Sequence, residues 1–142
     1  MIISFGCGQN NTGNKKNNLA SVINTTIDTF SSLPPEIVDC SCYFSNDSNE
    51  FKNGEYIYVN DFAEISFLKI NGTMRKFVQT SFRKIDLSHS KAEYQSDGYK
   101  MTIEILEVKQ SGYETSLKSG TIKLTDKNGK TITRSFYGEC GC

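Results

Sequence analysis

The chain lacks several features that would indicate a particular class of function. Its 142 residues contain no tryptophan, one histidine and three alanines. Sixteen basic residues balance sixteen acidic ones, so the electropositive surface typical of a nucleic-acid-binding protein is missing. The sequence also has no run of about 20 apolar residues, the length that a helix needs to cross a bilayer.

The residue types needed for catalysis are equally scarce. The single histidine, His89, lies in a polar stretch between two predicted strands, with Asp86 three positions before it. No serine, threonine or cysteine near them is marked as a nucleophile, so the sequence offers no set of nucleophile, base and orienting group. We therefore predict a protein that is not an enzyme and needs no cofactor, with His89 as a solvated loop residue.

From residue 38 onward the pattern is typical of β-structure. Short runs rich in β-branched and aromatic residues alternate with clusters of Gly, Asn, Asp and Ser, and no helix-length segments separate them. The sequence thus predicts an all-β fold, an antiparallel β-sandwich or barrel of about seven to eight strands. The predicted strands are 38–45, 55–60, 63–70, 74–80, 99–109, 113–118, 121–125 and 131–138.

The first 37 residues have a different character. Residues 8–18 contain no apolar side chain, which indicates an extended polar tether. Residues 19–32 place apolar side chains three and four positions apart, which predicts a short helix that Pro34 and Pro35 would stop. The predicted organisation is a signal remnant and tether over 1–18, a helix or linker over 19–37, and a β domain over 38–142.

Two local patterns predict details of the strands. In residues 99–108 the apolar positions change parity between Ile105 and Leu106, which predicts a β-bulge or a bend between two sheets. At residues 126–129, a three-residue loop with a left-handed Gly129 would pair Leu124 with Ile132. A two-residue turn would instead pair Leu124 with a threonine, so we predict the longer loop.

Four of the five cysteines form two matching pairs. Cys40 and Cys42 are separated by one residue, as are Cys140 and Cys142, so on strands both sulfurs of a pair lie on one face. A single antiparallel register then joins Cys40 to Cys142 and Cys42 to Cys140. We predict these two disulfides, which staple the last strand to the first.

Other uses of these cysteines remain open. Bridges within a pair would span Cα atoms about 6.6–6.8 Å apart on a strand, near the geometric limit of a disulfide. The remaining connectivity needs parallel end strands, which antiparallel folds rarely have. A zinc or copper(I) site on Cys40, Cys42, Cys140 and Cys142 is the alternative, because thiolates suit both metals, although structural zinc sites usually space their cysteines by two to four residues.

The fifth cysteine, Cys7, follows Ile2, Ile3, Phe5 and Gly6 and precedes the polar tether. This segment resembles the end of a bacterial lipoprotein signal peptide, in which an apolar run and a small residue precede a lipidated cysteine. The resemblance implies that Cys7 carries lipid and anchors the chain to a membrane of the cell envelope, on the periplasmic side or at the outer membrane. Disulfides fit that oxidising compartment. The alternative is a free Cys7 that packs as a small hydrophobe.

The predicted plan, with a lipid anchor, an antiparallel β domain and disulfides, is similar to that of small β-barrel lipoproteins that inhibit lysozyme. Ser111, Gly112 and Tyr113 resemble a fragment of their active loop. The resemblance implies a binding domain for a protein or glycan of the envelope, with an inhibitor-like or accessory role; the alternative is a metal-handling protein that uses the four paired cysteines. The candidate binding residues are Tyr56 and Tyr58, which either form an outward aromatic surface or belong to the core, and burial is the commoner outcome.

Overall fold

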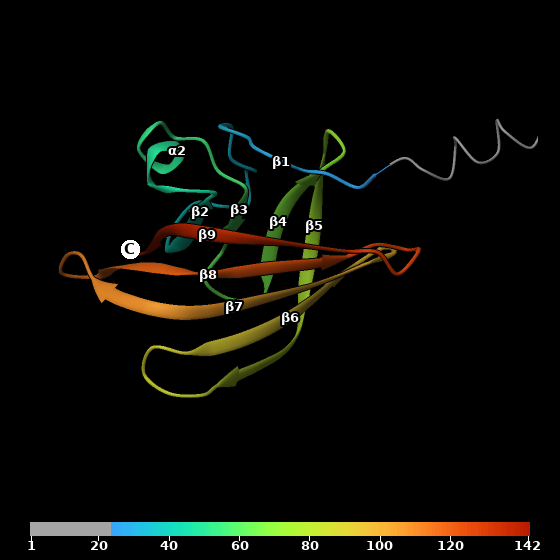
Figure 1. The fold of residues 1–142 in the computed structure, drawn as a ribbon. Helices are drawn as coiled ribbons and strands as arrows, with labels where there is room; N and C mark the ends of the chain where they lie inside the picture. The colour runs from blue at the N-terminus through green and yellow to red at the C-terminus, as the bar shows by residue number, and fades with distance from the viewer. Residues whose placement is uncertain (1–23) are drawn as a thin grey trace, which may run out of the picture.

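The structure, a computed structural model, describes residues 24–142 and confirms the all-β prediction. In this part of the chain, eight antiparallel strands close into a barrel and one short strand is added outside it (Figure 1). The elements are β1 (Ile27–Asp28), β2 (Ser41–Ser45), α2 (Ser48–Lys52), β3 (Tyr58–Asn60), β4 (Ile65–Ile70), β5 (Thr73–Lys84), β6 (Ser90–Ser96), β7 (Tyr99–Gln110), β8 (Thr115–Thr125) and β9 (Thr131–Gly141).

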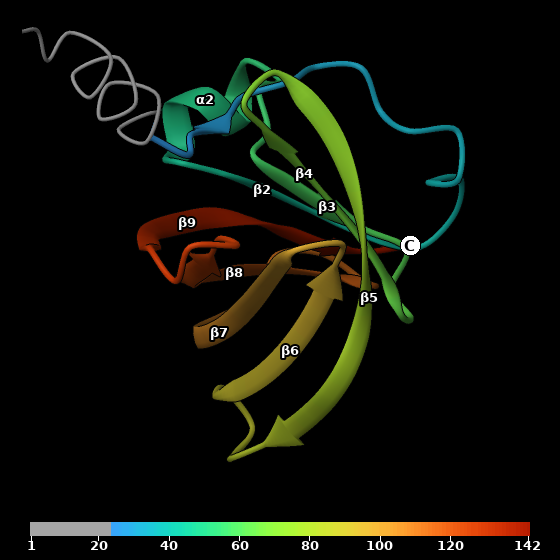
Figure 2. The same ribbon diagram turned by 90° about the vertical axis from the view of Figure 1, so that its right-hand side faces the viewer.

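The barrel follows the order of the chain. Each strand from β2 to β9 pairs antiparallel with the next, and β9 pairs with β2 to close the ring (Figure 2). β1 pairs with β4 beyond the end of β3, at Ile27–Ile70 and Asp28–Lys69. Closure leaves no free edge among the barrel strands, which protects the sheet from edge-to-edge association.

The seam between β2 and β9 has the register that the cysteine pattern predicts. Cys42 lies opposite Cys140, and both predicted disulfides, Cys40–Cys142 and Cys42–Cys140, are present. Because β2 and β9 are the first and last strands of the barrel, these bridges link its closing seam. Each joins residues about 100 positions apart, with sequence separations of 102 and 98.

The two predicted local details are also confirmed. The pairing of β7 with β8 shifts between Ile105 and Glu107, so a bulge lies at Leu106. In the β8–β9 turn, Gly129 has a φ of 83° and Leu124 lies opposite Ile132. The bulge lets β7 present apolar side chains to the interior on both sides of the parity change.

The predicted helix over residues 19–32 is wrong in its described part, while residues 19–23 lie outside the described residues. Ile27 and Asp28 form β1, and Phe30 makes an isolated bridge with Tyr56. These apolar residues do not share one helical face but pack in two separate clusters. Ile27 packs in the barrel core, and Phe30 packs in a second cluster outside it.

The structure differs from the prediction in three further elements. β6 was not predicted because SKAEYQS contains only two apolar residues, Ala92 and Tyr94, both of which are buried. α2 was not predicted either; Asp47 caps its start by accepting a hydrogen bond from the Glu50 amide. The runs predicted over 113–118 and 121–125 belong to one strand, β8.

The main core lies inside the barrel, and a smaller apolar cluster covers part of its outer surface. The outer cluster consists of Phe30, Ile37, Val59 and Phe67, with Tyr43 and Tyr56 packed against it. The segment before β2 therefore covers β3 and β4 from outside. No helix among the described residues has the length and apolarity needed to span a membrane.

Candidate functional site

One end of the barrel is hollow. We call this end the mouth; the loops over 61–64, 85–89 and 111–114 lie there, with the Cys42–Cys140 bridge. The opposite end, called the distal end, has the turns at 71–72, 97–98 and 126–130. A cavity of about 500 Å³ opens at the mouth and is lined by residues of β2, β3 and β5 to β8 and of two mouth loops.

Aromatic side chains line the deepest part of this cavity. Phe44 stacks on Tyr58 and Phe136, with ring centroids 5.1 and 4.1 Å apart. Phe44, Tyr58 and Tyr94 are buried and line the cavity, whereas Phe136 lies in the core cluster below. The stack forms the floor of the cavity, and core side chains such as Met101, Ile122 and Leu124 pack on its distal side. Toward the mouth the lining includes the small side chains of Ala92 and Ser116, which leave space inside the barrel.

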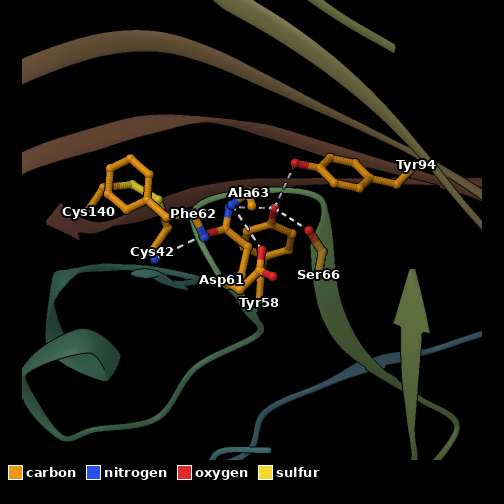
Figure 3. The surroundings of a disulfide bond; sticks show 9 residues. Cys42, Tyr58, Asp61, Phe62, Ala63, Ser66, Tyr94 and Cys140 are labelled. Atoms are coloured by element: carbon orange, nitrogen blue, oxygen red, sulfur yellow. Dashed lines mark hydrogen bonds between the residues drawn. A yellow bond between two sulfur atoms is a disulfide. The ribbon is translucent and has the colours of Figure 1, made fainter. Parts of the chain in front are cut away.

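A chain of hydrogen bonds crosses this floor (Figure 3). The Tyr58 hydroxyl lies 2.7 Å from the Ser66 hydroxyl and 3.4 Å from the Tyr94 hydroxyl, and Figure 3 shows the three groups converging. The Asn60 amide donates to the same Tyr58 oxygen, while its carbonyl accepts from the amides of Cys42 and Phe62. Burial raises the pKa of Tyr58 well above its usual value, and nearby Tyr94 adds to the rise. Tyr58 is therefore a neutral, structural part of the floor.

Three charged side chains and His89 line the cavity. Lys118 lies on β8 opposite Val108 and Gly138, and Lys84 lies on β5 opposite Ser90. Burial lowers the pKa of the Lys118 ammonium. Asp86 also lines the mouth, and its carboxylate accepts a hydrogen bond from the Ser88 amide. The two lysines outnumber the single carboxylate, so the lining of the cavity favours a negatively charged ligand.

His89 is less solvated than predicted. Its Nε2 lies 2.7 Å from a carboxylate oxygen of Glu104, and both side chains are about one-third exposed, at 31% and 32%. The pair ties the loop over 85–89 to β7. The sequence could have indicated it only through the pairing of β6 with β7, which places Ser90 opposite Ile105.

The rim of the mouth exposes large apolar side chains. Phe62, Phe82, Ile85, Leu87 and Tyr113 are between 45% and 94% exposed. Phe62 also has a φ of 65°, in the left-handed region that bulky residues rarely adopt, and the Asn60 side chain accepts its amide hydrogen bond. Exposed apolar residues gathered around a hollow indicate a binding surface.

The predicted site residues fall in different places. Tyr58 is buried in the floor, so the core prediction is right for it, whereas Tyr56 is half-buried in the outer cluster, 5.3 Å from the ring of Tyr43. Desolvation, followed by the influence of Tyr43, raises the pKa of Tyr56. The two tyrosines therefore do not form one surface, because the regular alternation of β3 begins only at Tyr58.

The remaining predicted positions concern the cysteines and the lysozyme-inhibitor fragment. The four paired cysteines are bonded as disulfides, so their sulfurs could bind metal only in a reduced protein. Cys7 lies outside the described residues. Ser111 and Tyr113 are in the loop at the rim; the Ser111 hydroxyl donates to Glu139 at 2.7 Å, and Tyr113 is 94% exposed.

Comparison with known proteins gives no family for this chain. No protein-family model matches it, and neither the curated proteins nor the solved structures contain a significant match.

Proposed function

We propose that this chain is a non-enzymatic binding domain of the bacterial cell envelope that engages its partner, a protein or a glycan, at the mouth of the barrel. The observation that carries this proposal is the gathering of exposed apolar side chains around one hollow end. A concave site with an apolar lining and a few converging polar groups is the usual form of a binding pocket. An inhibitor-like or accessory role would use this surface without chemistry.

The envelope location rests on the lipoprotein-like segment at Cys7. Two disulfides support it, because such bridges persist in oxidising compartments. The described chain also begins at the distal end, where the Thr25 hydroxyl donates to Asp126 at 2.9 Å. A lipid on Cys7 would thus connect to the barrel at the end away from the mouth.

Position-specific crosslinking in the native host tests the binding end. A photoreactive residue at Leu87, which is 88% exposed at the rim, should crosslink a partner protein or glycan. The matched control carries the same residue at Asn128, an exposed position in the distal β8–β9 turn. Crosslinking from Asn128 alone, or equally from both positions, would contradict binding at the mouth.

Mass spectrometry of protein purified from the native host tests the anchor. We expect Cys7 to carry acyl chains and the protein to fractionate with membranes. An unmodified Cys7 thiol in host-purified protein would contradict the proposed anchor without affecting the proposal for the mouth.

A further inference from the structure

Lys118 is the least expected side chain in the mouth. It lies on the same face of β8 as Gly120 and Ile122, and Ile122 is fully buried in the barrel core. Lys118 therefore faces the interior, where it lines the cavity. Its neighbour across the β8–β9 pairing is Gly138, which has no side chain that could cover the ammonium group.

The positive charge of Lys118 is not neutralised by the protein. Among residues 24–142, no carboxylate lies within ion-pair distance of its ammonium nitrogen; the ion pairs found there are Lys76–Glu36 and His89–Glu104. Burial lowers the pKa of this ammonium, because water no longer fully solvates the charge. An anion placed beside Lys118 would restore the lost solvation.

The other charged groups that line the cavity bear on the charge of a fitting ligand. Lys84 adds a second positive charge, and Asp86 one negative charge that the Ser88 amide already engages. His89 also lines the cavity, where Glu104 engages its ring, and the three remaining groups leave one net positive charge, which favours an anion.

One side of the cavity fits an apolar body. Ala92, Ile103, Ile105 and Val108 line one side, and the partly exposed rings of Phe62 and Phe82 stand at the opening. A volume of about 500 Å³ lies within the range of small-molecule sites, roughly 300–1,000 Å³. Eight-stranded barrels are wide enough to hold one such ligand.

We propose that the mouth binds a single-chain amphiphile with a carboxylate head group, such as a fatty acid, with the carboxylate at Lys118 and the chain against the apolar wall. This inference rests on the proposed function only in placing the binding site at the mouth. Lys118 supplies selectivity for the anion, whereas the apolar wall supplies most of the favourable free energy.

The test uses the oxidised full-length chain and three probes of equal chain length, namely decanoate, decanol and decylammonium. Titration calorimetry should give saturable 1:1 binding of decanoate and at least tenfold weaker binding of the other two. Amide NMR shifts should map to Ala92, Ile103 and Lys118. Equal binding of decylammonium, or shifts centred on the distal turns, would overturn the inference.

Variants of Lys118 separate its role from a general effect on folding. Lys118→Met should weaken decanoate binding at least tenfold while Lys118→Arg retains most of it. The matched control is Lys123→Met, on the same strand but exposed. Removing an unpaired inward charge should leave the fold intact, which a thermal melt checks. Unchanged decanoate binding by Lys118→Met would overturn the assignment.

The two proposals fail in different ways. If decanoate does not bind but Leu87 still crosslinks a protein or glycan, the amphiphile inference is wrong and the mouth remains the binding end. If decanoate does not bind and crosslinks arise only from the distal end, both proposals are wrong.

Discussion

The two ends of the barrel are built from different residues. The distal end uses tight, polar turns in which Gly72, Gly98 and Gly129 adopt positive φ, and none of the exposed large apolar side chains of residues 24–142 lies in these turns. The loops of the mouth instead present Phe62, Ile85, Leu87 and Tyr113 to solvent. Those apolar residues lie outside the strands that form the barrel. This difference is the basis of our proposal that the mouth is the binding end.

The largest expected effect on stability comes from the disulfides, which lie at the mouth end of the β2–β9 seam. Replacing Cys40, Cys42, Cys140 and Cys142 by serine should lower the free energy of unfolding by about 4–5 kcal/mol, the entropy that a loop of about 100 residues regains in the unfolded chain. Urea unfolding measures this loss. Hydrogen exchange should show that β2 loses protection while the β8–β9 hairpin keeps it.

A double variant is the control for that experiment. Cys42→Ser with Cys140→Ser retains the Cys40–Cys142 bridge, which closes nearly the same loop. It should melt at a lower temperature but still fold. A quadruple variant as stable as the native protein would show that the seam does not depend on its bridges.

Gly138 tests how closely the strands approach at the same seam. A Cβ at this position would collide with the carbonyl oxygen of Tyr43 and lie 2.6 Å from the ring of Phe44. Gly138→Ala must therefore displace β2 or β9, and we expect a loss of roughly 3 kcal/mol in the free energy of unfolding, at the upper end for overpacking.

The distal end supplies the matched control for Gly138. A Cβ at Gly129 would meet no atom within 4 Å, so Gly129→Ala adds only the backbone strain of its positive φ, about 1–2 kcal/mol. Denaturant titrations compare the two variants. A loss for Gly138→Ala no larger than that for Gly129→Ala would mean that the seam can relax.

Tyr58 probes the floor that separates the filled half of the barrel from the hollow one. Tyr58→Phe removes a hydroxyl that is hydrogen-bonded to Asn60, Ser66 and Tyr94. Each of these partners then loses one hydrogen bond at a site that water does not freely reach. The free energy of unfolding should fall by about 1–3 kcal/mol. Tyr113→Phe, at a 94% exposed ring, is the control and should leave stability unchanged. Equal effects of both substitutions would mean that the hydrogen-bond chain contributes nothing.

The sequence predicts the features that depend on local pattern. The cysteine spacing indicates the β2–β9 register, and the parity change beside Leu106 indicates the bulge, because side chains on a strand alternate strictly between two faces. β6 was not predicted because its own sequence is mostly polar, and its pairing with β5 and β7 holds it in the sheet.

The site is harder to predict because it depends on closure. Lys118 lies in a predicted strand, but its inward direction follows only once β8 is paired with β7 and β9. Likewise, His89 and Glu104 meet only through the β6–β7 register. The cavity at the mouth is lined by residues from distant segments, so a local sequence pattern does not predict it.

The smallest expected effect is that of acid on the distal end, where Asp126 stabilises the β8–β9 turn. Desolvation tends to raise the pKa of Asp126, but hydrogen bonds from the Thr25 hydroxyl and the Lys130 and Asn128 amides outweigh it, so the pKa lies below the ordinary value of 3.8. A depressed folded-state pKa contributes stability above the unfolded-state pKa, and this contribution is lost as pH falls through the folded-state pKa.

Asp126→Asn should therefore be slightly less stable than the native protein at neutral pH, and the difference should shrink below pH 3.8. Urea unfolding of both proteins between neutral and strongly acidic pH measures the difference, and a gap that stays constant across the range would show that the Asp126 charge does not stabilise the turn.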